Sequence, residues 1–473
     1  MNRKINIVFI LVIMLFTGTS CTKSENTAQK PNIIYILADD MGYNDLGCYG
    51  SELIQTPNID RLAAEGIKFT HHYAGNSVCA PSRCALMTGL HTGHCQVRGN
   101  LQWEPYGQLP LKAETTTVAS LLKNAGYKTA IIGKWGLGVE GTSGDPLKQG
   151  FDYSYGYLCQ VLAHNHCPEY LIENGKKVYL DNEVIYKDKS HWTEGLGSYP
   201  VKRKQFSQDL FTEKTIDFIE KNQDNPFFVY LSVIIPHDNG EAPKGKRYSD
   251  IPSFNPYENK DWTESEKGYA AMITHLDKDV GTIIKKLKEL GIDENTLVVF
   301  TSDNGGDSPD KFHSISNLPF RGHKRDLYEG GIREPMIAWW PGSIEPGRTS
   351  SHVSAFWDFM PTACDLAGVE APSNIDGISY LPELLGKQQA KHETLYFEFH
   401  EQGGKQAIIE GDWKCLRLNT KNPANMVVEL YNIANDKAEE NNLADLYPDK
   451  VKHLIALMEE QRTQNEYFNL YSK

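Results

Sequence analysis

The chain has 473 residues, of which 40% are hydrophobic and 11% aromatic. This apolar content supports a well-buried core and excludes an intrinsically disordered chain, and the length favours one large domain with a smaller one. The formal net charge of −13 argues against a nucleic-acid-binding protein, which would carry a basic excess.

The first residues have the pattern of an export signal. A basic start is followed by the apolar run Ile5–Phe16, which is too short to cross a bilayer. Small residues then precede Cys21, as at the cleavage site of a bacterial lipoprotein, and ordinary secretory cleavage nearby is the alternative. We predict a signal peptide over 1–21 and a polar linker over 22–30. The mature protein would be periplasmic, or attached to the cell envelope through a lipid anchor.

Strand-like apolar runs alternate with helical patterns through most of the chain. Such alternation is typical of an α/β fold with a large, mainly parallel or mixed sheet between helices. Thr56 and Pro57 fit the N-cap and first turn of a helix that Gly66 ends. The expected strands are 32–38, 128–133, 227–236 and 296–302, and the other expected helices are 116–125, 206–222 and 264–290.

The character of the sequence changes near residue 378. Short strand-like segments separated by turn residues predict a smaller antiparallel sheet, and one helical segment would pack on it. We therefore divide the chain into a large domain, 31–377, and a C-terminal subdomain, 378–473. The segments expected in the subdomain are strands 393–399, 405–409, 413–418 and 427–433 and a helix near 448–463.

Polar side chains stand where each of the four expected strands ends. In open α/β sheets, ligands bind beyond the carboxyl ends of the strands, so we expect these residues to meet at one edge. Alone, each group fits a turn or a helix cap. Together, the carboxylates and the amide offer only oxygen atoms, which Ca²⁺ and Mg²⁺ prefer. The residues at the four ends are Asp39 and Asp40, then Lys134, then His237, then Asp303 and Asn304.

The segment Cys79–Arg83 reads Cys-Ala-Pro-Ser-Arg, and a Thr-Gly pair ends the small-residue helix that follows. Pro81 suits a first helical turn, so Cys79 would lie at a helix N-terminus, where free amides favour an anion. This segment resembles the signature of type I sulfatases of the alkaline phosphatase superfamily. The resemblance covers nearly the whole mature chain, and continues in family order through 32–42, 133–135, 236–237, 301–305, 321–324 and 328–333.

The resemblance implies how such a site would work. In that family a separate maturation enzyme oxidises the cysteine to formylglycine, whose hydrate carries two hydroxyls. One attacks sulfur, and loss of the proton from the other releases sulfate. The implied ligands of one Ca²⁺ ion are Cys79 (as formylglycine), Asp39, Asp40, Asp303 and Asn304. The implied catalytic residues are Cys79, Arg83 to orient it, Lys134 and Lys324 to hold sulfate oxygens, and His237 as general acid.

The chain departs from the family at one position. The family usually carries a histidine two residues after the strand lysine, where this chain has Gly136. His164 and His166 are candidates to replace it, or to contact substrate, or to lie on a loop surface. His400, Glu401 and Gln402 are expected to contact a sugar from the C-terminal subdomain, unless they form an ordinary Gly-rich turn.

The remaining features narrow the function class. The pattern around Gly136 resembles bacterial sulfatases acting on sulfated galactose or N-acetylgalactosamine of host or algal glycans. A phosphate or phosphonate monoester hydrolase and a non-catalytic lipoprotein that binds sulfated glycans are the alternatives. Setting Cys21 and Cys79 aside from the nine cysteines leaves an odd number, which excludes a full disulfide framework. Cys159 and Cys167 either pair or remain buried thiols.

Overall fold

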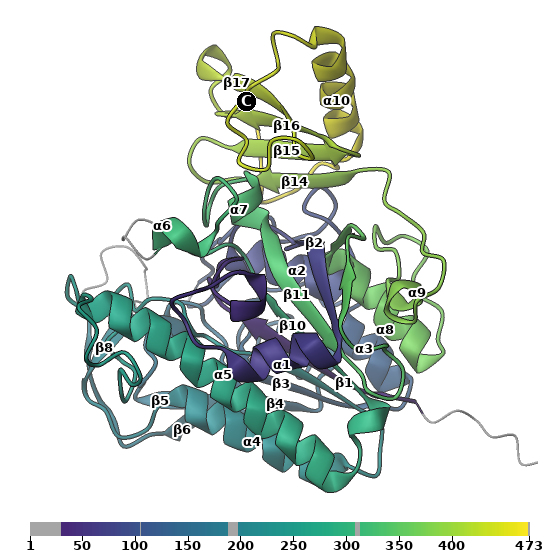
Figure 1. Cartoon of the computed structure of the whole chain (residues 1–473). Coiled ribbons are helices and arrows are strands. Elements are labelled where there is room, and N and C mark those ends of the chain that lie inside the picture. Colours follow the sequence, from purple (N-terminus) through teal and green to yellow (C-terminus); the bar gives the residue numbers. More distant parts are fainter. Residues whose placement is uncertain (1–29, 105, 188–196, 308–312, 472–473) are drawn as a thin grey trace, which may run out of the picture.

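The computed structural model describes residues 30–104, 106–187, 197–307 and 313–471 (Figure 1). The predicted signal peptide and all of the predicted linker except Lys30 lie outside these residues. The helices are α1 Pro57–Glu65, α2 Cys79–Thr88, α3 Val118–Asn124, α4 Ser207–Asn222, α5 Glu264–Leu290, α6 His313–Ser316, α7 Glu329–Ile332, α8 Phe359–Ala367, α9 Leu381–Leu384 and α10 Pro448–Glu460. The strands are β1 Asn32–Ala38, β2 Ile67–Tyr73, β3 Lys128–Lys134, β4 Tyr153–Tyr157, β5 Tyr170–Glu173, β6 Lys176–Tyr179, β7 Glu183–Tyr186, β8 Ser198–Lys202, β9 Phe227–Ser232, β10 Thr296–Ser302, β11 Arg333–Trp339, β12 Arg348–Ser350, β13 Ser354–Ala355, β14 Leu395–Phe399, β15 Lys405–Glu410, β16 Trp413–Leu418 and β17 Val427–Asn432.

The large sheet has the strand order β12-β2-β11-β10-β1-β9-β3-β4-β5-β6. Its central strands β10, β1, β9, β3 and β4 run parallel, while β11, β5 and β6 pair antiparallel with their neighbours. Every residue of β1 is buried, as expected for a central strand that helices cover on both faces. The predicted α/β fold with a mixed, mainly parallel sheet is therefore confirmed.

Two groups of helices cover the sheet, one on each face (Figure 1). Helix α5 contacts both α1 and α4, and these three helices form one group; α2, α3 and α8 contact one another and form the second. The long helix α5 begins at a capping box between Thr263 and Glu266 and ends at Gly291, which adopts a φ of 67°. No described helix has both the length and the apolar character to cross a membrane.

Strand β9 ends four residues earlier than the sequence predicts. Ser232 is the last residue of β9 that pairs with both neighbouring strands, opposite Leu37 of β1 and Gly133 of β3. The apolar run continues to Pro236, but β1 and β3 each extend only one residue beyond the partners of Ser232, to Ala38 and Lys134, so the regular pairing stops there. His237 consequently lies on a loop beyond the sheet edge and not at a strand terminus.

Thr56 occupies the predicted N-cap position of α1 but does not cap the helix. Its hydroxyl oxygen accepts a hydrogen bond from the Gly47 N–H instead. The Asp277 carboxylate, on α5, accepts the N–H groups of Asn58 and Ile59 at 2.8 Å each. A distant side chain therefore satisfies the first turn, which the local sequence pattern does not reveal.

The small sheet has the antiparallel order β14-β15-β16-β17 and stands at one end of the molecule, with β14 towards the large sheet (Figure 1). One face packs on residues around α2, so the two sheets share a hydrophobic cluster; the other face packs on α10. The predicted antiparallel sheet with one helix is confirmed, although α10 ends at Glu460 rather than near 463. The shared cluster contains Tyr73, Val78, Ala85, Leu327, Leu395, Phe397 and Phe399, among others.

A buried charge network also joins the small sheet to the large one. Lys414 of β16 contacts Glu329 of α7 at 2.9 Å and Glu439 at 3.0 Å, and none of these side chains is exposed. Burial would raise the pKa of Glu329, but the charges of Lys414 and Arg333 outweigh it and lower the pKa to about 2. Lys414 is therefore a cation on which two buried carboxyl groups depend.

Replacing Lys414 with Met is expected to lower the free energy of unfolding by about 3 kcal/mol, because two buried carboxyl groups lose their shared cation. Urea denaturation measures this change. The control is Lys452→Met, an exposed lysine of α10, for which we expect a change within about 0.5 kcal/mol. Equal stability of the two variants would show that the network contributes nothing.

Cys159 and Cys167 are both buried free thiols, so the predicted alternative of a disulfide between them is wrong. The Cys167 thiol donates to the carbonyl oxygen of Asp250 at 3.6 Å. No two cysteines in the described part of the chain form a disulfide.

Candidate active site

The ends of β1 and β10, the first and last of the four strand ends, meet as the sequence predicts. Strands β1 and β10 run parallel with Ala38 opposite Ser302, so Asp39 and Asp40 leave the sheet beside Asp303 and Asn304. The Asp40 N–H donates to Asp303 Oδ1 at 3.2 Å, and the Asn304 amide donates to Asp40 Oδ1 at 2.8 Å. All four side chains are buried. Register alone therefore gathers three carboxylates and an amide at one point.

Each carboxylate of this group has a cationic partner. Lys134 Nζ lies 2.7 Å from Asp39 Oδ2, Lys324 Nζ 2.5 Å from Asp40 Oδ2, and Arg83 Nη2 2.8 Å from Asp303 Oδ2. Burial would raise the pKa of Asp39, but the nearby positive charges, first that of Lys134, outweigh it and lower the pKa. Burial and the charge of Asp39 raise the pKa of Asp303 to about 7. The group is thus crowded with negative charge that cations must offset.

Cys79 is the first residue of α2, as Pro81 predicts, and only 3% of it is exposed. Its Sγ lies 3.5 Å from Asp39 Oδ1, and the next N–H, that of Ala80, donates to Asn100. Burial raises the pKa of the Cys79 thiol to about 12. At neutral pH the thiol keeps its proton, and an unmodified cysteine here would be a poor nucleophile.

The donor set fits a hard divalent cation. Ligand atoms of Asp39, Asp40, Cys79 and His237 all lie within 4.8 Å of one another. The Asn304 Oδ1 atom is buried and has no hydrogen-bond partner among the described residues. An orphaned amide oxygen beside carboxylate oxygens is the arrangement that Ca²⁺ or Mg²⁺ satisfies. Because most donor atoms in this group are oxygens, which such a cation prefers, His237 is better suited to proton transfer than to binding the metal.

Arg83 is fully buried below Cys79, one helical turn along α2. It donates to Asp303 through Nε and Nη2, at 3.2 and 2.8 Å, and to the Lys134 carbonyl oxygen at 2.8 Å. Arg83 also contacts the Ser232 hydroxyl. It therefore ties the helix to the ends of β3, β9 and β10.

His237 lies beside this group despite the early end of β9. Its Nδ1–H donates to the Asp238 carbonyl oxygen at 2.7 Å, and its Nε2 lies 3.1 Å from Lys324 Nζ and 3.4 Å from Asp40 Oδ2. Burial and the charge of Lys324 lower the pKa of His237. The free ring is therefore neutral, and Nε2 accepts from Lys324.

The two loop histidines have different positions. The His164 ring stacks on His237, with centroids 5.0 Å apart and planes 12° apart, and its Nδ1 lies 3.4 Å from Glu241 Oε1. His166 is fully buried, with one ring nitrogen 2.9 Å from the His237 carbonyl oxygen and the other 3.3 Å from Asp250. His166 thus supports the His237 loop and is not available to contact substrate. His164 adjoins the site.

The predicted sugar contacts of the small sheet follow β14. His400 is buried and tied to Glu398 at 2.9 Å, and Gln402 accepts a hydrogen bond from Lys405. Glu401 lies 3.6 Å from Arg325. Arg325 directly follows Lys324, which contacts the carboxylate group, so of the three predicted residues Glu401 is the one that the structure links to the site.

Gln160, which the sequence does not point to, occupies the space beside Gly136. Gly136 has a φ of 76°, and a Cβ at this position would lie 2.6 Å from Nε2 of Gln160. Neither candidate histidine fills this place. Gln160 and Arg325 carry no motif, and only the fold brings Gln160 next to a residue 24 positions away.

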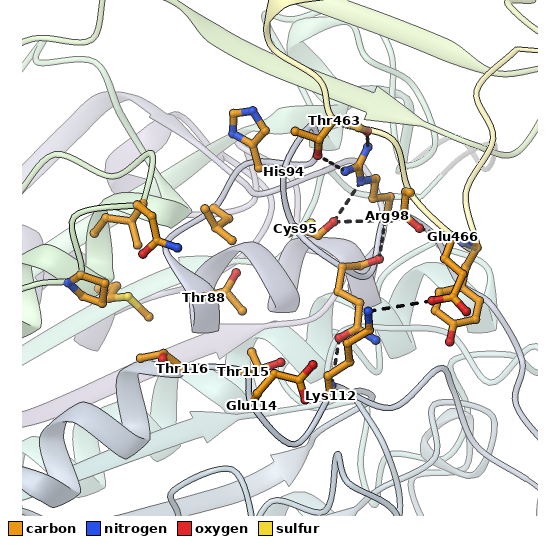
Figure 2. Close-up of a pocket in the computed structure, with 18 of the residues that line it drawn as sticks. Thr88, His94, Cys95, Arg98, Lys112, Glu114, Thr115, Thr116, Thr463 and Glu466 are labelled. Atoms are coloured by element: carbon orange, nitrogen blue, oxygen red, sulfur yellow. Dashed lines mark hydrogen bonds and ion pairs between the residues drawn. The ribbon is translucent and has the colours of Figure 1, made fainter.

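A separate cavity of about 390 Å³ lies at the other end of α2 (Figure 2). Thr88, the last residue of the helix, lines it, whereas Cys79 is the first. At 1.5 Å per residue the two ends are about 13 Å apart. This cavity is therefore distinct from the carboxylate site.

His91, His94 and Asp376 form a second group with metal-ligand chemistry, and His94 borders the cavity (Figure 2). His94 Nδ1 lies 2.8 Å from Asp376 Oδ1. The Gly93 N–H donates to Nδ1 of His91, which places the proton of the neutral ring on Nε2. A protonated Nε2 is not ready to ligate a metal, so we read this group as structural.

Comparison with known proteins agrees with the geometry. The fold, with carboxylates and cationic side chains gathered at its strand ends, is that of the alkaline phosphatase superfamily. Residues 31–369 match the sulfatase family model, and residues 322–466 match the model of the C-terminal region of N-sulphoglucosamine sulphohydrolase. The chain belongs to the sulfatase family and is a sulfuric ester hydrolase.

Three similar proteins illustrate the relationship. An N-acetylgalactosamine-6-sulfatase of Canis lupus familiaris is 35% identical over 403 residues, covering 81% of this chain and 72% of that protein. An N-acetylgalactosamine-6-O-sulfatase of Bacteroides thetaiotaomicron is 29% identical over 531 residues, covering 96% and 98% respectively. The crystal structure of Ps i-CgsB superposes with a TM-score of 0.74 at 30% identity, covering 93% of this chain and 95% of that chain.

Proposed function

We propose that the protein hydrolyses sulfate monoesters of a glycan, with Cys79 converted to formylglycine and one Ca²⁺ bound. The observation that carries this proposal is the position of Cys79, at a helix N-terminus and 3.5 Å from Asp39 within the carboxylate group. Formylglycine, made by a separate maturation enzyme, would supply a hydroxyl nucleophile that a buried thiol of high pKa cannot. Ca²⁺ would add positive charge where sulfate binds.

The residues of the chain would share the remaining work. Asp39, Asp40, Asp303 and Asn304 would hold the cation together with position 79. Lys134 and Lys324 each reach a carboxylate at this point, so their ammonium groups lie where they would also bind sulfate oxygens. Arg83, held by Asp303, would fix the helix that carries the nucleophile.

The leaving oxygen needs a proton, and His237 is positioned to donate one from Nε2. Its Nδ1–H is held by the Asp238 carbonyl oxygen, so Nε2 faces Lys324 and Asp40. Because Nε2 accepts from Lys324 in the free site, the proton would come from the His237–Lys324 pair. General acid catalysis of this kind matters most when the leaving group is a poor one.

His237→Ala is therefore expected to lower kcat/KM about 1,000-fold for sugar sulfates, whose alcohol leaving groups are poor, and at most about tenfold for 4-nitrophenyl sulfate. Steady-state release of sulfate from the two substrates measures this difference. An equal loss on both substrates would contradict the role of His237 as general acid.

We propose sulfated galactose or N-acetylgalactosamine as the sugar. The relatives described above include N-acetylgalactosamine-6-sulfatases, and Ps i-CgsB has also been solved with k-i-k-neocarrahexaose. The test is release of inorganic sulfate from 3-, 4- and 6-sulfated galactose, N-acetylgalactosamine and N-acetylglucosamine, with a phosphate ester as control. Peptide mass spectrometry first establishes that Cys79 is modified. The proposal would be refuted if the modified protein hydrolysed only the phosphate ester, or if it released sulfate from none of the sugars.

A further inference from the structure

We propose that the side-chain amide of Gln160 donates a hydrogen bond to the sulfate group in the active site, in the space that Gly136 leaves open. This inference rests on the proposed function and adds a substrate-binding residue to it. Three observations support it: the course of the chain around Gln160, the close approach of its side chain to Gly136, and the lack of a hydrogen-bond partner for the amide nitrogen within the described part of the chain.

The chain around Gln160 passes from beside Lys134 to beside His237, two of the proposed catalytic residues. Strand β4 ends at Tyr157, which lies opposite Lys134 in β3. Seven residues after Tyr157, the His164 ring stacks on His237. Gln160 stands between these two points, so its backbone lies at the same edge of the sheet as the carboxylate group. Its N–H donates to Gln108 Oε1 at 2.8 Å, which fixes the backbone there.

Gly136 leaves room for this side chain. A Cβ at position 136 would lie 2.6 Å from Gln160 Nε2, closer than a Cβ atom normally comes to another heavy atom, and 3.0 Å from Gln160 Cγ. The amide of Gln160 therefore lies directly over a backbone that is two residues beyond Lys134. Any side chain at position 136 would have to displace it.

The amide nitrogen has no hydrogen-bond partner among the described residues, although Gln160 is only 6% exposed. Leaving a buried N–H without an acceptor costs about 1–3 kcal/mol, so such a group usually serves a ligand or an ordered water. A sulfate ester offers only acceptor oxygens. A neutral amide can bind them without adding to the charges of Lys134 and Lys324.

The test compares Gln160→Leu and Gln160→Glu with wild-type protein and with Gln149→Leu. Gln149 is a matched control because it is also buried, but its amide donates to two backbone carbonyl oxygens, of Lys112 and Ser143. We expect Gln160→Leu to lower kcat/KM about 100-fold, as loss of one donor to a developing anion does. It should also weaken inhibition by inorganic sulfate about tenfold. Gln149→Leu should change both within about threefold.

Gln160→Glu separates a binding role from a structural one. Its carboxylate would repel sulfate at neutral pH, whereas the protonated acid can donate a hydrogen bond. Its activity relative to wild type should therefore rise as the pH falls. The assignment of Gln160 would be overturned if Gln160→Leu and Gln149→Leu had the same kcat/KM and the same inhibition by sulfate. It would also be overturned if the activity of Gln160→Glu relative to wild type did not rise at low pH.

Calorimetric titration with sulfate distinguishes failure of this inference from failure of the proposed function. If the wild type hydrolyses nothing but binds sulfate, the proposed function fails, and weaker binding by Gln160→Leu still supports the assignment. Unchanged binding by Gln160→Leu overturns it. A wild type that neither hydrolyses sulfate esters nor binds sulfate overturns both.

Discussion

Cys79→Ala is expected to lower sulfate release at least about 10⁴-fold, since removing the nucleophile removes the step on which every other group acts. Measurement of sulfate release from the preferred sugar sulfate tests this. The control is Cys84→Ala, a buried cysteine of the same helix, which should retain activity within about tenfold because it contacts none of the carboxylates described above. Residual activity of Cys79→Ala near that of Cys84→Ala would exclude a nucleophile at position 79.

Cys79→Ser sharpens the same test. Its hydroxyl can accept the sulfuryl group but has no second hydroxyl on the same carbon to release it. The variant should therefore turn over once at most and accumulate a sulfated serine, which intact-protein mass spectrometry detects. Sustained turnover by Cys79→Ser would argue against the proposed role of formylglycine.

Asp303→Ala is expected to abolish activity and to lower the free energy of unfolding by about 3–5 kcal/mol. The variant loses a proposed ligand of the cation and leaves the buried Arg83 without its carboxylate at 2.8 Å. Increasing Ca²⁺ should raise the midpoint of thermal unfolding of the wild type, because the cation would bind the folded state. The midpoint of the variant should not change with Ca²⁺.

Two further measurements make this prediction independent of whether the variant folds. Treatment of wild-type protein with EDTA should remove activity, and added Ca²⁺ should restore it better than Mg²⁺ does. Asp261→Ala, at an exposed carboxylate, should respond to Ca²⁺ as the wild type does. Full activity after exhaustive chelation would refute a metal at this site.

The large sheet, and the part of the site that contains Asp39, Asp303 and Cys79, could be predicted because they depend on local sequence patterns. The apolar run of β1 and the parallel register of β1 with β10 place Asp39 beside Asp303 once a parallel sheet is inferred. Pro81 marks a helix start, so the position of Cys79 follows from a short segment. These elements carry their own signals in hydrophobic period and turn chemistry.

The rest depends on contacts between distant segments. Lys324 lies on a loop, and only the resemblance to a family pointed to it. The stacking of His164 on His237, and the position of Gln160 over Gly136, arise from how a long loop folds back across the sheet edge. The end of β9 was misplaced for a similar reason, since the apolar run to Pro236 continues after both neighbouring strands have stopped pairing.

The small sheet is built into the support of the active site. Val78, which precedes Cys79, and Ala85 of α2 pack in one hydrophobic cluster with Phe397 and Phe399 of β14. The chain leaving β14 then carries Glu401 to Arg325, beside Lys324. The small sheet, which would contact the glycan, therefore also supports the helix that carries Cys79. Replacing the small sheet with that of a relative would have to reproduce its packing against Val78 and Ala85, beneath Cys79. We therefore expect substrate preference to change more readily through single substitutions around the active site than through exchange of the whole subdomain.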